Sequence, residues 1–199
     1  MRIGRWIAAG LGIAAIGAAA VYAQYRNTEE PEFALVRADG DYSLRDYPAL
    51  VVAEVTSTGD RQRASGASFR RLAAYIFAQD RPQGGESIAM TAPVLQQETG
   101  AGAWRMRFVM PAKYTLATLP PAPADIALTE VPARRMAAVR FSGNGSQSDL
   151  AAREAQLRRW LEAQGIVPVG EAEYAFYDAP MVPGPLRRNE VLIPVAAAD

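Results

Sequence analysis

The chain contains one short pattern twice, and this internal repeat restricts the possible folds more than any other feature of the sequence. Residues 45–59 read RDYPALVVAEVTSTG, and residues 129–143 read TEVPARRMAAVRFSG. Identical residues recur at a constant separation of 84 positions: Pro48 and Pro132, Ala49 and Ala133, Ala53 and Ala137, Val55 and Val139, Gly59 and Gly143. We interpret the repeat as a duplication, which predicts two similar halves related by a pseudo-two-fold axis.

Each copy is followed by a stretch with helical periodicity, at residues 64–79 and 148–164. Apolar side chains share one face of each stretch: Phe69, Leu72, Ala73 and Ile76 in the first, and Leu150, Leu157, Trp160 and Leu161 in the second. An Ala-Pro turn (92–93 and 179–180) and an arginine-led strand closing in proline (105–111 and 188–194) then follow in both halves. This common order of strand, helix, turn and strand supports the duplication.

Short runs rich in β-branched and aromatic residues predict strands. The longer runs are 33–37, 42–47, 51–56, 104–110, 127–130, 136–141, 172–177 and 190–195, and shorter ones are 88–90 and 94–97. Asp39-Gly40 separates the first two runs and predicts a hairpin. Many short strands with two helices predict an α+β domain, built as a curved antiparallel sheet or open barrel with the helices on its outside.

The first 23 residues have the composition of a targeting segment. Arg2 and Arg5 precede an uninterrupted run of apolar and small residues, and Val21-Tyr22-Ala23 offers small residues where a signal peptidase cleaves, before Gln24. The run is also almost long enough to span a membrane, so residues 1–23 are either a cleaved signal peptide or a retained anchor. Both alternatives export the remainder, a short linker at 24–32 and one domain at 33–195, which would be periplasmic or tethered to the inner membrane.

The residue types that the chain lacks exclude several functions. It has no cysteine and no histidine, which removes disulfides, zinc–sulfur sites, thiolate nucleophiles and the usual general base. No histidine is present to activate a serine, so we expect no catalytic residues, no metal site and no enzyme activity. The 21 basic and 21 acidic residues balance, and a balanced charge predicts no binding of nucleic acid. We expect a monomer.

Four motifs occur in the order and spacing of a known family. They are YSLRDYP at 42–48, IAMTAPV at 88–94, FVMPAKY at 108–114 and RRNEV at 187–191. Together they resemble the SOUL/heme-binding-protein family over residues 31–195. The resemblance implies duplicated β-α-β-β halves that form a distorted antiparallel β-barrel flanked by two α-helices. It also implies binding of heme or another tetrapyrrole, without established catalytic chemistry.

The resemblance further implies that the tetrapyrrole lies against the first helix and under the loop before the RRNE motif. Carried over to this chain, the contacts are Phe69, Leu72, Ala73 and Ile76 from the helix, and Tyr177, Pro180 and Met181 from the loop. An aliphatic and aromatic wall suits a flat, mostly apolar macrocycle, and methionine adapts to its outline. The alternative is that residues 69–76 form only the core stripe of a packed helix.

The polar residues at 187–190 allow two interpretations. In a strand, Arg188 and Glu190 lie on one face and would pair with each other at the rim of the sheet, while Asn189 would cap a neighbouring turn. Arg187, next to the loop, would instead meet the propionates of a porphyrin, because a guanidinium group suits a carboxylate.

Some members of that family offer a histidine ligand to the heme iron, and this chain has no histidine. Tyrosine, methionine or Lys113 remain as axial ligands, and the resemblance places Tyr177 and Met181 nearest. We expect weak, largely hydrophobic binding without histidine ligation, for which a metal-free porphyrin or a bilin fits about as well as heme. The alternative function is an interaction module that binds an amphipathic partner or another apolar small molecule.

The targeting segment generates the first testable prediction. Because small residues precede Gln24, the mature chain should begin at Gln24 or remain tethered by residues 6–23. N-terminal sequencing of the protein from its native host distinguishes the two outcomes. Recovery of the full-length chain in the soluble cytoplasmic fraction would contradict both.

Overall fold

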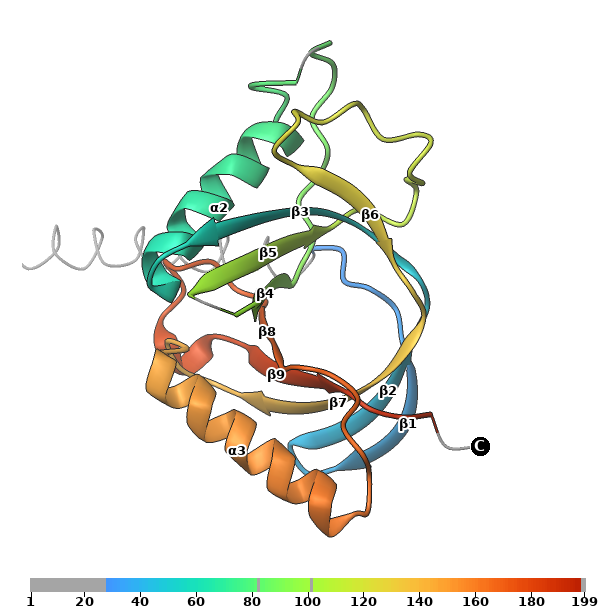
Figure 1. Cartoon of the computed structure of the whole chain (residues 1–199), viewed down its shortest axis with the longest axis vertical. Coiled ribbons are helices and arrows are strands. Elements are labelled where there is room, and N and C mark those ends of the chain that lie inside the picture. The colour runs from blue at the N-terminus through green and yellow to red at the C-terminus, as the bar shows by residue number, and fades with distance from the viewer. Residues whose placement is uncertain (1–27, 82, 101, 198–199) are drawn as a thin grey trace, which may run out of the picture.

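Nine antiparallel strands form one curled sheet in the computed structural model, which describes residues 28–81, 83–100 and 102–197. Two long helices pack on the outside of the curl (Figure 1). The strands are β1 (Ala34–Asp39), β2 (Tyr42–Tyr47), β3 (Leu50–Thr58), β4 (Val94–Glu98), β5 (Ala103–Val109), β6 (Ala127–Val131), β7 (Arg134–Phe141), β8 (Glu173–Phe176) and β9 (Asn189–Pro194). The helices are α2 (Arg61–Ile76), α3 (Gln147–Ala163) and a short 3-10 turn, η1 (Gly184–Leu186). The expected α+β fold, a distorted half-barrel flanked by two helices, is confirmed.

The strand order shows the duplication directly. The order is β1-β2-β7-β9-β8-β4-β5-β3-β6, so β8 and β4 meet at the centre and the strands on either side of them correspond in pairs. The two halves are β2-β3-α2-β4-β5 and β6-β7-α3-β8-β9. The first strand of each half pairs with the other half, because β2 lies beside β7 and β6 lies beside β3.

The pairing registers agree with the separation of 84 found in the sequence. Tyr47 pairs with Arg134, and the residues 84 positions away from each of them, Val131 and Leu50, also pair. Gly59 and Gly143 both follow the second strand of their half and both have a positive φ, of 116° and 128°, which is why each copy keeps a glycine there. The duplication is therefore confirmed.

Several local expectations are wrong. The Ala-Pro turns are not equivalent, since residues 92–93 precede β4 whereas residues 179–180 follow β8. The run at 88–90 is not a strand, because the Ile88 nitrogen donates to the Ile76 carbonyl at 2.7 Å and holds this loop against the end of α2. α3 begins at Gln147, one residue earlier than expected, because Ser146 caps it in a capping box with Asp149. Asp60 caps α2, which starts it three residues earlier than expected.

Three apolar clusters hold the sheet and helices together. One lies between α2 and the first half and includes Leu72, Ile76 and Met106, and another lies between α3 and the second half. The third fills the inside of the curl with residues from both halves: Val52, Leu95, Val109, Val131, Met136, Ala138, Ala175 and Leu192. The interior is thus a packed core to which the two halves contribute together.

A buried ion pair crosses the inside of the curl and accounts for part of the RRNE motif. Glu190 on β9 accepts two hydrogen bonds of 2.8 Å from Arg45 on β2, and the two residues are 3% and 9% exposed. The Tyr177 hydroxyl donates to the same carboxylate at 2.7 Å. The expected pairing of Glu190 with Arg188 is wrong, because Arg188 pairs with Glu30 at 2.8 Å. Asn189 does cap a neighbouring turn, donating to the Gly143 carbonyl at 2.9 Å.

Within residues 28–197, excluding positions 82 and 101, no helix has the length and apolar character to cross a membrane. The expected targeting segment lies outside the described residues.

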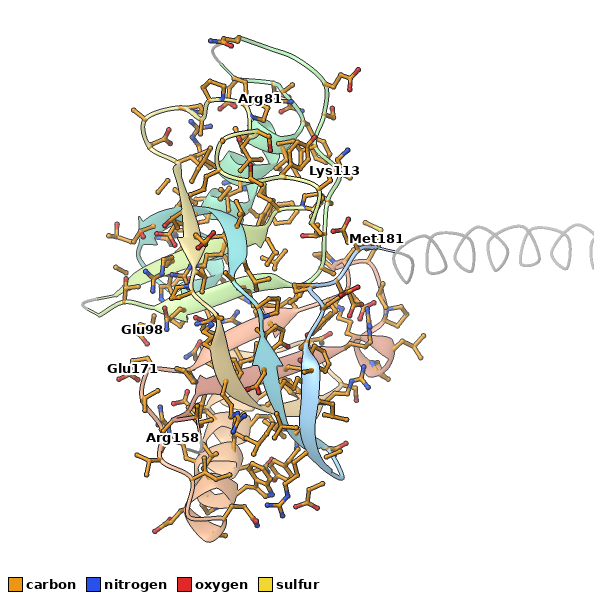
Figure 2. All side chains as sticks on the ribbon, turned by 90° about the vertical axis from the view of Figure 1, so that its right-hand side faces the viewer. Arg81, Glu98, Lys113, Arg158, Glu171 and Met181 are labelled. Carbon is orange, nitrogen blue, oxygen red and sulfur yellow. The ribbon has the colours of Figure 1, made fainter. Side chains whose placement is uncertain are left out.

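The buried pair predicts a large stability effect. Glu190→Gln should lower the free energy of unfolding by about 3–5 kcal/mol, because it leaves the Arg45 guanidinium buried without a counter-charge. Urea denaturation followed by circular dichroism measures the change. Glu171→Gln is the control, since the Glu171 side chain, labelled in Figure 2, is 80% exposed and its loss should cost less than about 0.5 kcal/mol. Equal stability of the two variants would show that the pair contributes little.

Candidate functional site

A cavity of about 660 Å³ opens on the outer side of the sheet, over the β4–β8 junction where the two halves meet. Its walls come from α2, from the loop between β8 and β9, and from the turn that precedes α3. The volume is in the range of small-molecule sites, which typically enclose about 300–1,000 Å³. The site therefore lies where strand pairing brings together segments far apart in the sequence.

Most of the cavity wall is apolar. The side chains that form it are Phe69, Met90, Ala92, Val94, Met106, Phe176, Tyr177, Pro180 and Met181. Phe69 packs edge-on against Phe108, with ring centroids 5.3 Å apart, and remains 38% exposed. Met181 is 66% exposed and lies at the surface (Figure 2). An aromatic ring held at its edge and open on one face can stack against a flat ligand.

Gly66 opens the helical wall of the cavity. It lies inside α2, where glycine costs about 1 kcal/mol relative to alanine. A Cβ built at this position would contact only the Arg70 Nη1 atom, at 3.7 Å, so packing does not explain the glycine. The missing side chain instead leaves the backbone of α2 accessible from the cavity.

The charged residues of the cavity are mostly basic. Arg61, Arg70 and Arg187 line it, and Asp178 is the acid among the lining residues. Asp178 is already engaged, since it accepts a 2.6 Å hydrogen bond from the Arg188 backbone nitrogen. Burial lowers the pKa of Arg61. An anionic group on a ligand would therefore be favoured over a cationic one.

Arg187 serves the loop that covers the cavity. Its Nε donates to the Val182 carbonyl at 2.7 Å, and its Nη2 donates to the Pro180 carbonyl. Both acceptors belong to the same loop as Arg187, so these bonds hold the shape of the loop between β8 and β9.

Tyr177 connects the cavity to the inside of the curl. It lines both the large cavity and a small internal one of about 30 Å³. Burial, together with the charge of Glu190, raises the pKa of Tyr177 well above its usual value. The group therefore remains a neutral phenol at physiological pH and keeps its hydrogen bond to Glu190.

The structure brings together five of the eight residues expected at the site. Phe69, Tyr177, Pro180, Met181 and Arg187 line one cavity. The other three do not line it: Leu72 and Ile76 are fully buried in the core under α2, and Ala73 is partly buried on the same helix. Four further lining residues were not expected from the sequence: Arg61, Gly66, Arg70 and Phe176. Of these, only Gly66 is unusual in the sequence, because an isolated glycine inside a helical pattern indicates a packing or functional reason.

The cavity suits a tetrapyrrole better than a bare metal ion. Among the residues that the structure describes, no group of three or more Asp or Glu side chains could hold a metal ion. The apolar lining, which includes Gly66, Phe69 and Phe176, would take an apolar macrocycle, and the arginines of the lining would suit its carboxylates. A bound iron porphyrin would supply an iron centre, and the chain's own residues would hold the ring and shield it from water.

Comparisons with solved structures support the fold. The C-terminal domain of EcmrR has a TM-score of 0.59 at 13% identity, and the match covers 79% of this chain and 98% of that one. A protein described as a hydrolase from Listeria innocua has a TM-score of 0.55 at 12% identity, with 81% and 94% covered. An uncharacterized conserved protein from the same organism has a TM-score of 0.53 at 13% identity, with 87% and 96% covered. Identities this low show a common fold alone.

No curated protein matches the chain. The family model described as SOUL heme-binding protein matches residues 28–194, which contain both halves of the repeat and every residue of the cavity. The chain belongs to the SOUL heme-binding protein family.

Proposed function

We propose that the protein binds heme or a related tetrapyrrole in the cavity beside α2 and acts as a non-catalytic carrier or buffer outside the cytoplasm. The observation that carries this proposal is the apolar hollow whose lining includes Gly66, Phe69 and Phe176 together with three arginines. Such a hollow matches a macrocycle that is apolar across its face and anionic at one edge. Membership of the SOUL family favours the same ligand class.

A binding role without catalysis follows from the side chains at the cavity. Ser65 lines it, but its hydroxyl accepts a 2.9 Å hydrogen bond from the Gln96 amide, and the chain has no histidine to activate it. The Asp178 carboxylate accepts a hydrogen bond from the Arg188 backbone nitrogen. The place of action rests on residues 1–23, whose composition is typical of an export signal or anchor.

Phe69 provides the direct test of the site. Phe69→Ala should weaken binding of both hemin and a metal-free porphyrin by about 1–3 kcal/mol, or roughly 5- to 150-fold in Kd, because apolar contact is lost. Titration followed at the Soret band measures this. Phe77→Ala is the matched control, since Phe77 is 43% exposed at the end of α2 and lies outside the cavity lining. If wild-type protein gives no Soret change with either ligand, the alternative of an interaction module is favoured.

A substitution at Gly66 distinguishes an effect on ligand binding from an effect on stability. Gly66→Leu should raise the free energy of unfolding by about 0.5 kcal/mol, because leucine favours the helix more than glycine does. It should also weaken porphyrin binding at least about tenfold, because its side chain occupies the hollow. Ala67→Leu is the control, since Ala67 is exposed on α2 and does not line the cavity. Porphyrin binding unchanged in Gly66→Leu would place the ligand elsewhere.

A further inference from the structure

Arg61 is a partly buried arginine that forms no ion pair with any carboxylate of the described residues, although Asp60 precedes it in the sequence. It is the first residue of α2, and its three hydrogen bonds go to neutral acceptors. Nε donates to the Gln147 side chain at 2.9 Å, Nη1 to the Gln96 side chain at 3.2 Å, and Nη2 to the Gly145 carbonyl at 2.7 Å. No carboxylate of the described residues forms an ion pair with it.

Two arginines of the sheet are neutralised by carboxylates. Arg45 forms a two-bond pair with Glu190, and Arg134 forms a similar pair with Glu173, with both bonds at 2.8 Å in each case. Removing a charge from water is costly unless a partner compensates for it. Arg61 differs from Arg45 and Arg134 in having no carboxylate partner among the described residues, and it shares this feature with Arg187 of the same cavity.

The free hydrogen-bonding capacity of Arg61 matches a carboxylate. A guanidinium group has five N–H donors. Three are used, which leaves one N–H on Nη1 and one on Nη2. Gln96 is held with its oxygen towards Arg61, because its amide nitrogen donates to Ser65 at 2.9 Å. The guanidinium is therefore fixed before any ligand arrives.

Arg61 lies where its two unused N–H groups can serve a ligand in the cavity. Arg61 lines the cavity, and its guanidinium carbon lies 5.7 Å from the centroid of the Phe176 ring, which forms part of the apolar wall. Arg187 also keeps unused N–H groups, but it lies on the loop between β8 and β9 and bonds the Val182 and Pro180 carbonyls of that loop. Arg61 is instead held by groups from β4 and from the start of α3. Arg70 is an exposed residue on the next turns of the helix. A ligand carboxylate near Arg61 would meet both a fixed cation and little competing water.

We propose that Arg61 is the anion-recognition residue of the cavity, so that the site selects flat apolar ligands that carry a carboxylate. Its two unused terminal N–H groups bind that carboxylate, while Gly66, Phe69 and Phe176 hold the apolar part. This inference rests on the proposed function, because it assumes that the ligand occupies the same cavity.

The test compares mesoporphyrin IX, a metal-free dicarboxylic acid, with its dimethyl ester. Wild-type protein should bind the acid at least about tenfold more tightly than the ester, as measured by quenching of porphyrin fluorescence. Arg61→Gln should remove most of this difference by weakening the acid about tenfold while changing the ester less than about twofold. Arg61→Lys, which keeps the charge, should retain part of the preference.

Arg63→Gln is the matched control, because the Arg63 side chain is 84% exposed on the same turn of α2 and should not alter either affinity. Equal loss of acid and ester in Arg61→Gln, or no loss of either, would overturn the proposal. Should Arg61→Gln fail to fold, added NaCl decides the matter on wild-type protein: it should weaken the acid and leave the ester unaffected. Wild-type protein that binds acid and ester equally rejects only the Arg61 proposal, whereas binding of neither compound rejects the proposed function as well.

Discussion

The exchange of first strands between the two halves is the constraint on which the rest of the structure depends. β2 finds its partner in β7, and β6 finds its partner in β3, so neither half can satisfy the backbone of its own first strand. The Arg45–Glu190 pair reinforces the exchange, since Arg45 lies on β2 and Glu190 on β9 of the other half. The interior cluster, built from both halves, then fills the curl that the exchange creates.

The cavity lies beside α2, and the two halves differ in the loop that connects their last two strands. The connection from β4 to β5 is a tight turn between Glu98 and Ala103, whereas the connection from β8 to β9 runs from Phe176 to Asn189 and contains η1. The longer loop lines the cavity beside α2, and Arg187 holds the shape of this loop by bonding to its carbonyls. The duplication thus gives both halves one plan, and the long loop and Gly66 both line the cavity beside α2.

The sequence could predict the frame but only part of the site. The repeat, with its paired glycines, predicted the symmetry of the strand order, and Asp39-Gly40 predicted the first hairpin. The many short apolar runs and two helical stretches predicted the α+β class. Helical periodicity could not separate Phe69, which faces the cavity, from Leu72 and Ile76, which face the core, because all lie on one broad apolar face. The partner of Glu190 was misjudged because it comes from a strand far away in the sequence, which alternation within β9 cannot reveal.

The strand exchange also bears on the origin of the domain. A chain with one repeat would have no partner for its first strand, and two such chains could complete their sheets only by trading those strands in a symmetric, domain-swapped dimer. The present molecule has the geometry of that dimer joined into one polypeptide. In such a dimer, symmetry would make the two grooves beside the helices equal. In one polypeptide the two grooves can differ, and in this chain the halves do differ in the loop that follows β4 or β8.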